Sequence, residues 1–180
     1  ISRGLVGSEM CIRDRHYGRL DVLDNNIGIA SNLSVVEESE EYWERINLKP
    51  MFLMSKYAIP AMISSGDGGS IVNISSISAT RPKGLTAYST SKGAVLSLTQ
   101  AMAVDHGGEG IRVNCILPGP VYTPMVYASS SYLNQEGMSS EQRSQRQNAS
   151  LLQIEGEGWD IGKAVVYLSS NLNLPSSPRS

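Results

Sequence analysis

Apolar residues along the first part of the chain alternate between a short β-like run and a longer helix-like stretch. The run 21–23 leads into turn residues at 25–28, which is typical of a short strand and its turn. Apolar residues at helical spacing from 37 to 64 predict a long helical region. Pro50 and Pro60 are expected to mark kinks or turns within it, because proline interrupts helical hydrogen bonding.

The same alternation continues through the middle of the chain. The β-branched run 70–75 predicts a buried strand. Small and apolar residues from 88 to 106 predict the most regular helix, which the glycine pair 107–108 closes. The run 111–117 predicts a third strand that ends at the prolines and glycine of 118–120.

The last third of the chain is more polar. Residues 120–158 are rich in Ser and Gln, and a stretch of this length in a compact domain predicts a functional lid or a partly helical segment. Its two arginines, Arg143 and Arg146, are expected to be solvated. A helical pattern follows from 159 to about 170, where Asp160 suits the N-cap position.

Strand, helix, strand, helix, strand is the order of a parallel sheet with helices on its faces, so an α/β fold is expected. Ligands of such sheets bind beyond the carboxyl ends of the strands. Three segments directly follow predicted strands: 25–28, 75–76 and 118–123. We therefore expect the chemistry of the protein at these segments.

Composition narrows the class of protein. The 180 residues are 41% hydrophobic and 18% charged with a net charge of -2, which suits one globular domain and argues against binding to nucleic acid or anionic membranes through bulk charge. No apolar run approaches the roughly 20 residues that span a bilayer. Cys11 and Cys115 cannot form a disulfide framework, so a reducing cytoplasm is the expected location. No cluster of residues has the spacing of a metal site.

The most chemically suggestive pair is Tyr88 and Lys92. They lie four residues apart, one turn apart on the same face of the predicted helix 88–106. This spacing arises by chance in many proteins, but Ser76 ends a predicted strand twelve residues earlier and Asn47 lies in the preceding helical region. Ser75, thirteen residues before Tyr88, competes with Ser76 for the same role, and we favour Ser76 for its place at the strand end.

These residues occur within longer motifs that resemble the classical short-chain dehydrogenase/reductase family. The matching segments are Asn25-Asn26-Ile27-Gly28, Asn47 in INLK, Ser76 in IVNISS, Tyr88 and Lys92 in AYSTSKGA, and Pro118-Gly119 with Thr123 in NCILPGPVYTP. The resemblance covers roughly residues 17–170. It implies a Rossmann-type doubly wound parallel sheet, truncated to the family's strands four to six and their flanking helices.

The resemblance also implies a role for each of these side chains. Tyr88 would be the general acid/base, Ser76 would polarise the substrate oxygen, and Asn47 would anchor a water that links Lys92 to solvent. A free phenol releases its proton only near pH ~10, and an ammonium one turn away favours the phenolate. Lys92 is placed to have this effect on Tyr88, and by resemblance it also binds the nicotinamide ribose.

The implied cofactor is NAD or NADP, and the sequence does not indicate which. The residues expected to contact it, besides Tyr88 and Lys92, are Asn25, Asn26, Gly28, Pro118, Gly119, Val121 and Thr123. The segment 25–28 would approach the adenosine half, and 121–123 would meet the carboxamide and phosphates. Each segment also has a plainer interpretation, as a turn that ends a strand.

Both ends of the chain depart from the family pattern. Residues 1–14 resemble a translated sequencing adapter, and 171–180 read as a frame-shifted or disordered tail. This leaves 15–170 as a partial NAD(P)-binding domain with a variable lid at 120–158. The family's glycine-rich turn and last strand are not visible. We therefore expect the chain, expressed as written, to be poorly soluble and inactive.

The expected activity of the parent protein is NAD(P)-dependent interconversion of a secondary alcohol and a ketone. Its partners would be a small-molecule substrate and further copies of itself in a dimer or tetramer, formed through the helices near 40–64 and 88–106. The alternative is a non-catalytic, shortened relative that serves as a subunit-pairing or regulatory module. The intact Ser76, Tyr88 and Lys92 favour the enzyme.

Overall fold

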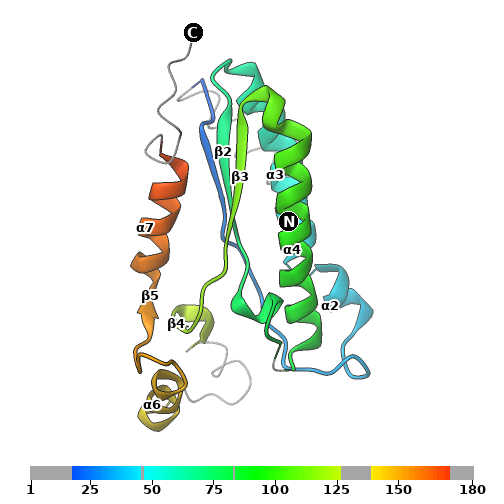
Figure 1. Ribbon diagram of the computed structural model, residues 1–180. Helices are drawn as coiled ribbons and strands as arrows, with labels where there is room; N and C mark the ends of the chain where they lie inside the picture. The colour runs from blue at the N-terminus through cyan, green and yellow to red at the C-terminus, as the bar shows by residue number, and fades with distance from the viewer. Residues whose placement is uncertain (1–17, 46, 83, 127–138, 171–180) are drawn as a thin grey trace.

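The computed structural model describes residues 18–45, 47–82, 84–126 and 139–170. The predictions for 1–14 and 171–180 lie outside these residues. Within the described part, β1 (Val22–Asn25), β2 (Gly69–Ile74) and β3 (Ile111–Ile116) form a parallel sheet in the order β1-β2-β3 (Figure 1). The three predicted strands and the α/β class are therefore confirmed.

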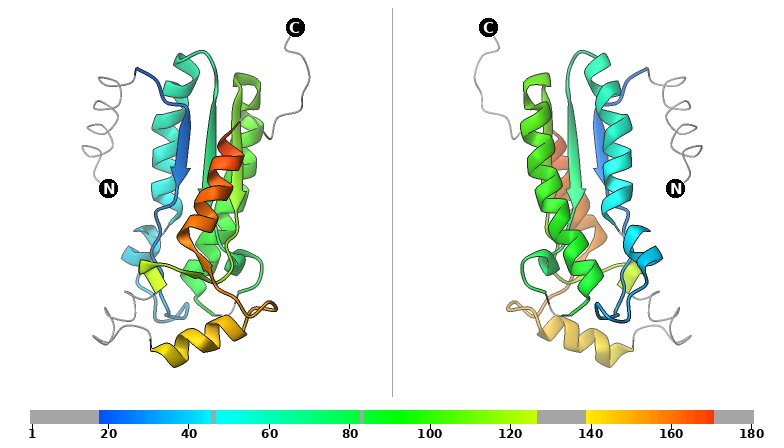
Figure 2. Two further views of the ribbon diagram at one scale, coloured as in Figure 1. Left: turned by 90° about the vertical axis from the view of Figure 1, so that its left-hand side faces the viewer. Right: turned by 90° about the vertical axis from the view of Figure 1, so that its right-hand side faces the viewer.

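The sheet is covered on both faces, as a doubly wound fold requires. Helices α3 (Leu48–Ser64) and α4 (Thr86–His106) lie on one face, and α7 (Gly158–Ser169) lies on the other (Figure 2). Every residue of β2 after Gly69 is buried. A central parallel strand covered on both faces favours apolar residues, which explains Ile71, Val72 and Ile74; the polar Ser70 and Asn73 are buried among them.

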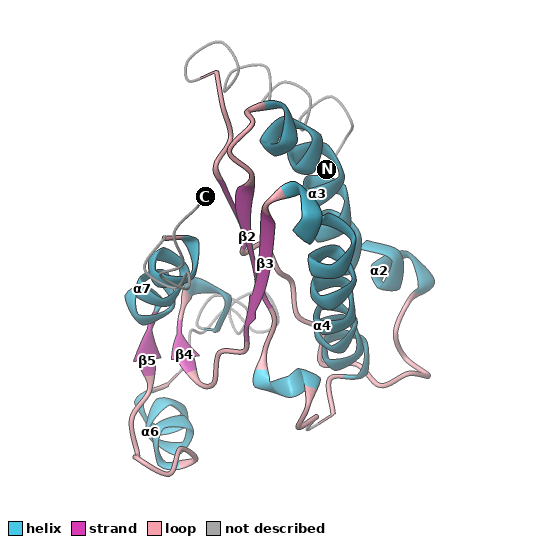
Figure 3. Cartoon of the chain, turned by 45° about the horizontal axis from the view of Figure 1, so that its top comes forward, coloured by secondary structure: helices cyan, strands magenta, loops and turns pink. Residues whose placement is uncertain are grey.

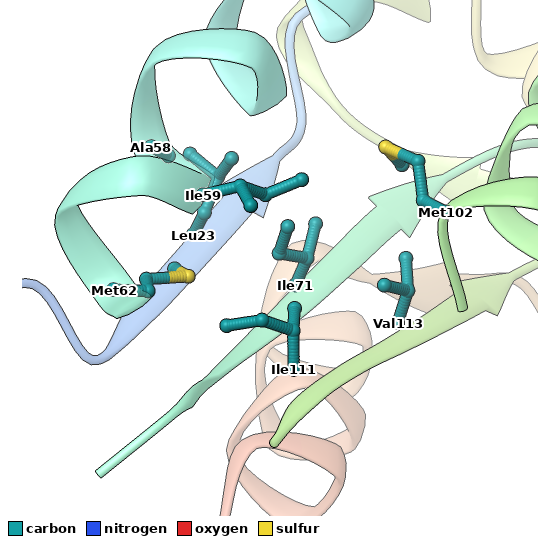
Figure 4. Close-up of a cluster of buried hydrophobic side chains, with 8 residues drawn as sticks. All are labelled: Leu23, Ala58, Ile59, Met62, Ile71, Met102, Ile111 and Val113. Carbon is teal, nitrogen blue, oxygen red and sulfur yellow. The ribbon is translucent and has the colours of Figure 1, made fainter. Parts of the chain in front are cut away.

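The main core lies between the sheet and the α3–α4 layer. Its buried side chains come from all three strands and both helices, and Figure 4 shows them converging: Leu23, Ala58, Ile59, Met62, Ile71, Met102, Ile111 and Val113. Met62 and Ile71 are fully buried at the centre of this cluster. The core thus fixes how α4, which carries Tyr88 and Lys92, lies against the strands.

The predicted helical region 37–64 is two helices rather than one kinked helix. It divides into α2 (Glu40–Arg45) and α3, and the break is at Asn47, whose φ is +31°. Pro50 is in the first turn of α3, where its missing N–H costs nothing, and Pro60 lies inside that helix. The interruption between the two helices lies at Asn47, whose side chain is buried, rather than at either proline, and a kink at Pro60 stays a prediction.

Two short 3-10 helices follow elements of the main sheet and its helical layer. Turn η1 (Ile77–Ala79) follows β2, and η2 (Gly107–Glu109) follows α4. The chain then reverses at Gly110, which has a positive φ of 77°. The glycine-rich end that the sequence predicts for this helix is thus confirmed, with Gly110 in the left-handed conformation that favours glycine.

The described parts of the 120–158 segment form a small unit apart from the main sheet. Strand β4 (Val121–Tyr122) pairs in parallel with β5 (Gly156–Glu157), and α6 (Ser140–Asn148) lies beside this ladder (Figure 3). The segment is therefore partly helical, as predicted. Asp160 is not the N-cap of α7: it lies in the first turn and its carboxylate accepts a hydrogen bond from the backbone N–H of Glu157 at 2.9 Å.

Within the described residues, no helix is long and apolar enough to cross a membrane. The same part of the chain has no group of three or more His, Cys, Asp or Glu residues that could hold a metal ion.

Candidate active site

The predicted site residues gather where the strands of the main sheet end and α4 begins. Tyr88 and Lys92 lie in the first two turns of α4, and Lys92 Nζ is 5.7 Å from the centre of the Tyr88 ring. The ammonium therefore lies close to the phenol, as the four-residue spacing predicts. Tyr88 is half-buried, so part of its ring remains open to solvent.

Lys92 is the buried charge of the site. Its side chain is 3% exposed, and Nζ donates a hydrogen bond to the backbone oxygen of Ile74, the last residue of β2, at 2.8 Å. Burial lowers the pKa of Lys92 to about 8. This is the only hydrogen bond of Nζ to the described part of the chain, so two of its three N–H groups can still donate to water or to a ligand.

Asn47 ties the loop after β1 to α4. Its Oδ1 accepts a hydrogen bond from Ile29 N at 2.8 Å, and its Nδ2 donates to Ile29 O and to Ser91 Oγ, each at 3.0 Å. The side chain is only 2% exposed. Since every one of these bonds is internal, Asn47 contributes a fixed position rather than a free polar group.

Gly28 lies beside both of these residues. A Cβ atom built on Gly28 would be 3.2 Å from Asn47 Oδ1 and 3.5 Å from Lys92 Nζ. The absence of a side chain therefore allows the loop after β1 to approach the amide and the ammonium. The sequence predicted a cofactor contact at Gly28 and did not indicate this close approach.

The two candidate serines have different surroundings. Ser75 is buried, and its hydroxyl donates to the backbone oxygen of Lys92 at 2.7 Å. Ser76 is half-buried at the start of η1, where its Oγ accepts a hydrogen bond from Ser78 N at 3.1 Å. The Ser76 O–H can still donate, whereas that of Ser75 is engaged inside the fold. This difference favours Ser76 as the serine that meets substrate.

A buried row of neutral polar side chains lies behind the site. Asn25 Nδ2 donates to Ser55 Oγ at 3.1 Å and to Asn73 Oδ1 at 2.8 Å, and Asn73 Nδ2 donates to Thr99 Oγ1 at 2.9 Å. The row joins β1, β2, α3 and α4. Sequence reasoning missed Ser55, Asn73 and Thr99. The one available signal was a polar Asn between Val72 and Ile74, in the interior of the predicted strand 70–75.

The remaining predicted cofactor residues lie along two connections. The Asn25 side chain is buried in the polar row, whereas Asn26 is exposed. In the turn after β3, Pro118 O accepts from Ile77 N at 3.1 Å, which joins this turn to η1. Gly119 is exposed, while Val121 and Thr123 are half-buried.

Cys115, predicted to be a small core residue, is in β3 but only half-buried. Burial raises the pKa of its thiol, against smaller opposing effects from hydrogen bonds to Thr99 and Ser75. The thiol therefore stays protonated behind the site.

Comparison with known sequences identifies relatives over most of the chain. A family described as enoyl-(acyl carrier protein) reductase matches residues 12–174. A short chain dehydrogenase/reductase of Aspergillus oryzae is 35% identical over 160 residues, which are 86% of this chain and 59% of that protein. The meso-2,3-butanediol dehydrogenase of Serratia marcescens is 42% identical over 112 residues, covering 60% of this chain and 44% of that protein.

Solved structures with the same fold include two dehydrogenases. The aldohexose dehydrogenase of Thermoplasma acidophilum superposes with a TM-score of 0.81 at 32% identity, over 92% of this chain and 66% of that chain. Carveol dehydrogenase of Mycobacterium avium in complex with NAD superposes with a TM-score of 0.84 at 27% identity, over 94% and 65%. This chain thus spans less than two thirds of either structure and of the two curated relatives.

Proposed function

The chain belongs to the short-chain dehydrogenase/reductase family, and we propose that it carries the catalytic centre of an NAD(P)-dependent enzyme that interconverts a secondary alcohol and a ketone. The observation that carries this proposal is the buried ammonium of Lys92 beside the phenol of Tyr88. In this proposal Tyr88 exchanges a proton with the substrate oxygen, and the ammonium of Lys92, 5.7 Å from the centre of its ring, supplies positive charge beside it.

The other residues orient the reaction. Ser76 donates its hydroxyl hydrogen to the substrate oxygen and polarises the carbonyl. Asn47 holds the loop after β1 against α4, next to Lys92, so that water can reach the ammonium and replace the proton that Tyr88 transfers. The internal bonds of Asn47 to Ile29 and Ser91 support this positioning role.

The residues present fit a dinucleotide at the carboxyl edge of the sheet. Lys92 has two N–H groups that no described residue accepts from, and ribose hydroxyls are suitable acceptors. The loop with Asn26 and Gly28 follows β1 at the same edge, where Gly28 lies close to Lys92, and the turn with Pro118, Gly119, Val121 and Thr123 offers backbone groups and a hydroxyl. When bound, the nicotinamide supplies or accepts the hydride.

The outer face of α3 and α4 supports pairing with a second copy of the chain. A groove of about 500 Å³ lies there, lined mainly by apolar side chains from α2, α3 and α4. Trp43 and Phe52 border it and are 49% and 48% exposed. Two such faces packed together would remove this apolar surface from water. This groove also supports the second candidate, a non-catalytic subunit-pairing module.

Dinucleotide binding separates the two candidates. We expect saturation-transfer NMR to detect binding of NADH or NADPH to the chain, and Lys92→Met to weaken it at least tenfold. Tyr88→Phe should bind nearly as well as the wild type, and in any preparation that reduces butane-2,3-dione it should abolish turnover. A folded chain that dimerises but binds neither dinucleotide would contradict the enzyme and favour the pairing module.

A further inference from the structure

Helix α6 is held in place without apolar packing. None of its nine residues is buried, and its sequence SEQRSQRQN contains no apolar side chain. Its first turn is closed by Ser139 and Gln142, which cap each other's backbone N–H groups. These bonds stabilise the helix itself but do not attach it to the rest of the protein. Among the described residues, the contacts that attach it come from charged and aromatic side chains.

Glu155 supplies this attachment. Its side chain is only 1% exposed although it lies in a polar segment. Arg146 Nε donates to Glu155 Oε1 at 2.9 Å, and Arg143 Nε lies 3.6 Å from Oε2. A buried carboxylate is stable only when it is paired, so both arginines of α6 are drawn to this position.

Arg143 extends the contact to a third segment. Its guanidinium lies 3.8 Å from the centre of the Tyr122 ring, within the range of a cation–π interaction. Tyr122 belongs to β4, directly after the turn of Pro118 and Gly119. We call Tyr122, Arg143, Arg146 and Glu155 the Glu155 clamp. It joins α6, β4 and the residue that precedes β5.

The clamp lies at the functional end of the molecule. Figure 1 places α6 and β4 at the same end of the sheet as η1 and the first turns of α4, which carry Ser76 and Tyr88 at their starts. A shift of α6 would therefore change what borders the candidate active site. Since Tyr122 lies between Val121 and Thr123, the shift would also reach the proposed cofactor turn.

We propose that Glu155 is a positioning residue whose ion pairs hold α6 in place as a lid helix that can be released. Through Arg143 and Tyr122, the same contacts fix the position of α6 relative to the proposed cofactor turn. The role of α6 as a lid and the contact with a cofactor turn rest on the proposed function, whereas the ion pairs themselves do not. Ion pairs at partly exposed arginines are screened by salt, whereas apolar packing is strengthened or unaffected. The clamp therefore makes the position of α6 sensitive to ionic strength.

Trypsin offers a direct test, because its cleavage sites Arg143 and Arg146 lie within the clamped helix. Glu155→Gln keeps the size of the side chain and removes its charge. We expect it to increase the rate of cleavage after these arginines at least tenfold at low salt, followed by mass spectrometry. Cleavage after Lys163, on α7, serves as the internal reference and should not change.

Two further variants separate positioning from general loss of structure. Glu141→Gln removes the same charge from an exposed residue of α6 that no described residue pairs with, and it should leave the cleavage rate within twofold of the wild type. Glu155→Asp keeps the charge and should restore part of the protection. In the wild type, raising NaCl to about 1 M should by itself reproduce the effect of Glu155→Gln.

The outcomes are decisive whether or not the variant folds. Equal cleavage of Glu155→Gln and Glu141→Gln would overturn the proposal. So would salt-independent cleavage of the wild type, which needs no variant. None of these measurements requires turnover or a bound dinucleotide. A chain that binds no dinucleotide yet shows salt-dependent release of α6 would contradict the proposed function and leave the clamp standing.

Discussion

Two regions of the molecule hold polar groups in place by different means. Behind Lys92, the buried row from Ser55 to Thr99 uses neutral amides and hydroxyls that hydrogen-bond one another inside the core. Around α6, charged side chains hold a helix that has no buried residue. In the first region the interacting groups are all buried. In the second, a surface helix is held by ion pairs to one buried carboxylate, that of Glu155.

The difference indicates what each region can tolerate. Buried neutral hydrogen bonds are little affected by salt, but each group that loses its partner carries a large desolvation cost. Ion pairs at a surface contribute little to global stability and weaken as salt rises. The rigid region is suited to chemistry that needs fixed geometry. The charge-held region is suited to admitting and releasing substrate.

Removing the centre of the buried row should have the largest effect. Asn73→Ala removes the hydrogen bonds that Asn25 and Thr99 each make with Asn73, and it opens a cavity in β2, so we expect the free energy of unfolding to fall by about 3 kcal/mol. Urea unfolding measures this loss. Asn148→Ala, at the end of α6, is the control and should change stability by less than about 0.5 kcal/mol. A loss below about 1 kcal/mol for Asn73→Ala would contradict the importance of the row.

The charge of Lys92 should make stability depend on pH. Its folded pKa, lowered to about 8 by burial, lies below the ordinary value of 10.5, so the unfolded chain binds more protons between these values. Stability should therefore rise as pH increases from 8 to about 10.5, by roughly 2–3 kcal/mol relative to Lys92→Met. Urea unfolding of both proteins at pH 7 and pH 10 tests this. A constant difference between them would show that Lys92 titrates alike in both states.

A third variant tests whether a charged side chain of the rigid region, Arg112, responds to salt differently from the Glu155 clamp. Arg112, on β3, donates from its Nη atoms to the backbone oxygens of Leu168, Ser169 and Ser170 at 2.7, 3.2 and 3.4 Å. Arg112→Met should lower the free energy of unfolding by about 2 kcal/mol, because three backbone oxygens at the end of α7 each lose a charged donor.

The acceptors of Arg112 are neutral, so this loss should be nearly the same at low and high salt. Arg81→Met, at an exposed position, provides the matched control. A loss for Arg112→Met that disappears in high salt would remove the contrast between the two regions.

The smallest global effect is expected from the clamp itself. Glu155→Gln should shift the free energy of unfolding by no more than about 1 kcal/mol, because α6 can open without the core. Hydrogen exchange in α6 should nevertheless rise strongly, while amides of β2 keep their protection. Loss of protection in both elements would mean that α6 and the core unfold as one unit.

The sequence predicted what local pattern can encode. Strands 22–25, 69–74 and 111–116 and helices α4 and α7 follow from apolar spacing, and the Tyr88–Lys92 pair follows from helical periodicity. Two features of the rigid region were not predictable. The break at Asn47 depends on bonds to Ile29 and Ser91, which are distant in sequence. The polar row needs four elements to meet.

The Glu155 clamp was not predictable from the sequence either. Arg143 and Arg146 were expected to be solvated, and their side chains are 44% and 35% exposed, but the sequence did not indicate that both also contact a carboxylate that is 1% exposed. Nothing in the polar segment distinguishes Glu155 from its neighbours until β4 and β5 pair.

The site depends on Lys92, a buried ammonium beside Tyr88. The most direct test is the titration of the Lys92 side chain, followed by the Cε chemical shift of ¹³C-labelled lysine and assigned by its loss in Lys92→Met. We predict a midpoint about 8, set by burial against β2. A midpoint near the ordinary lysine value of about 10.4 would show that Lys92 is solvated, and would contradict the account of the site.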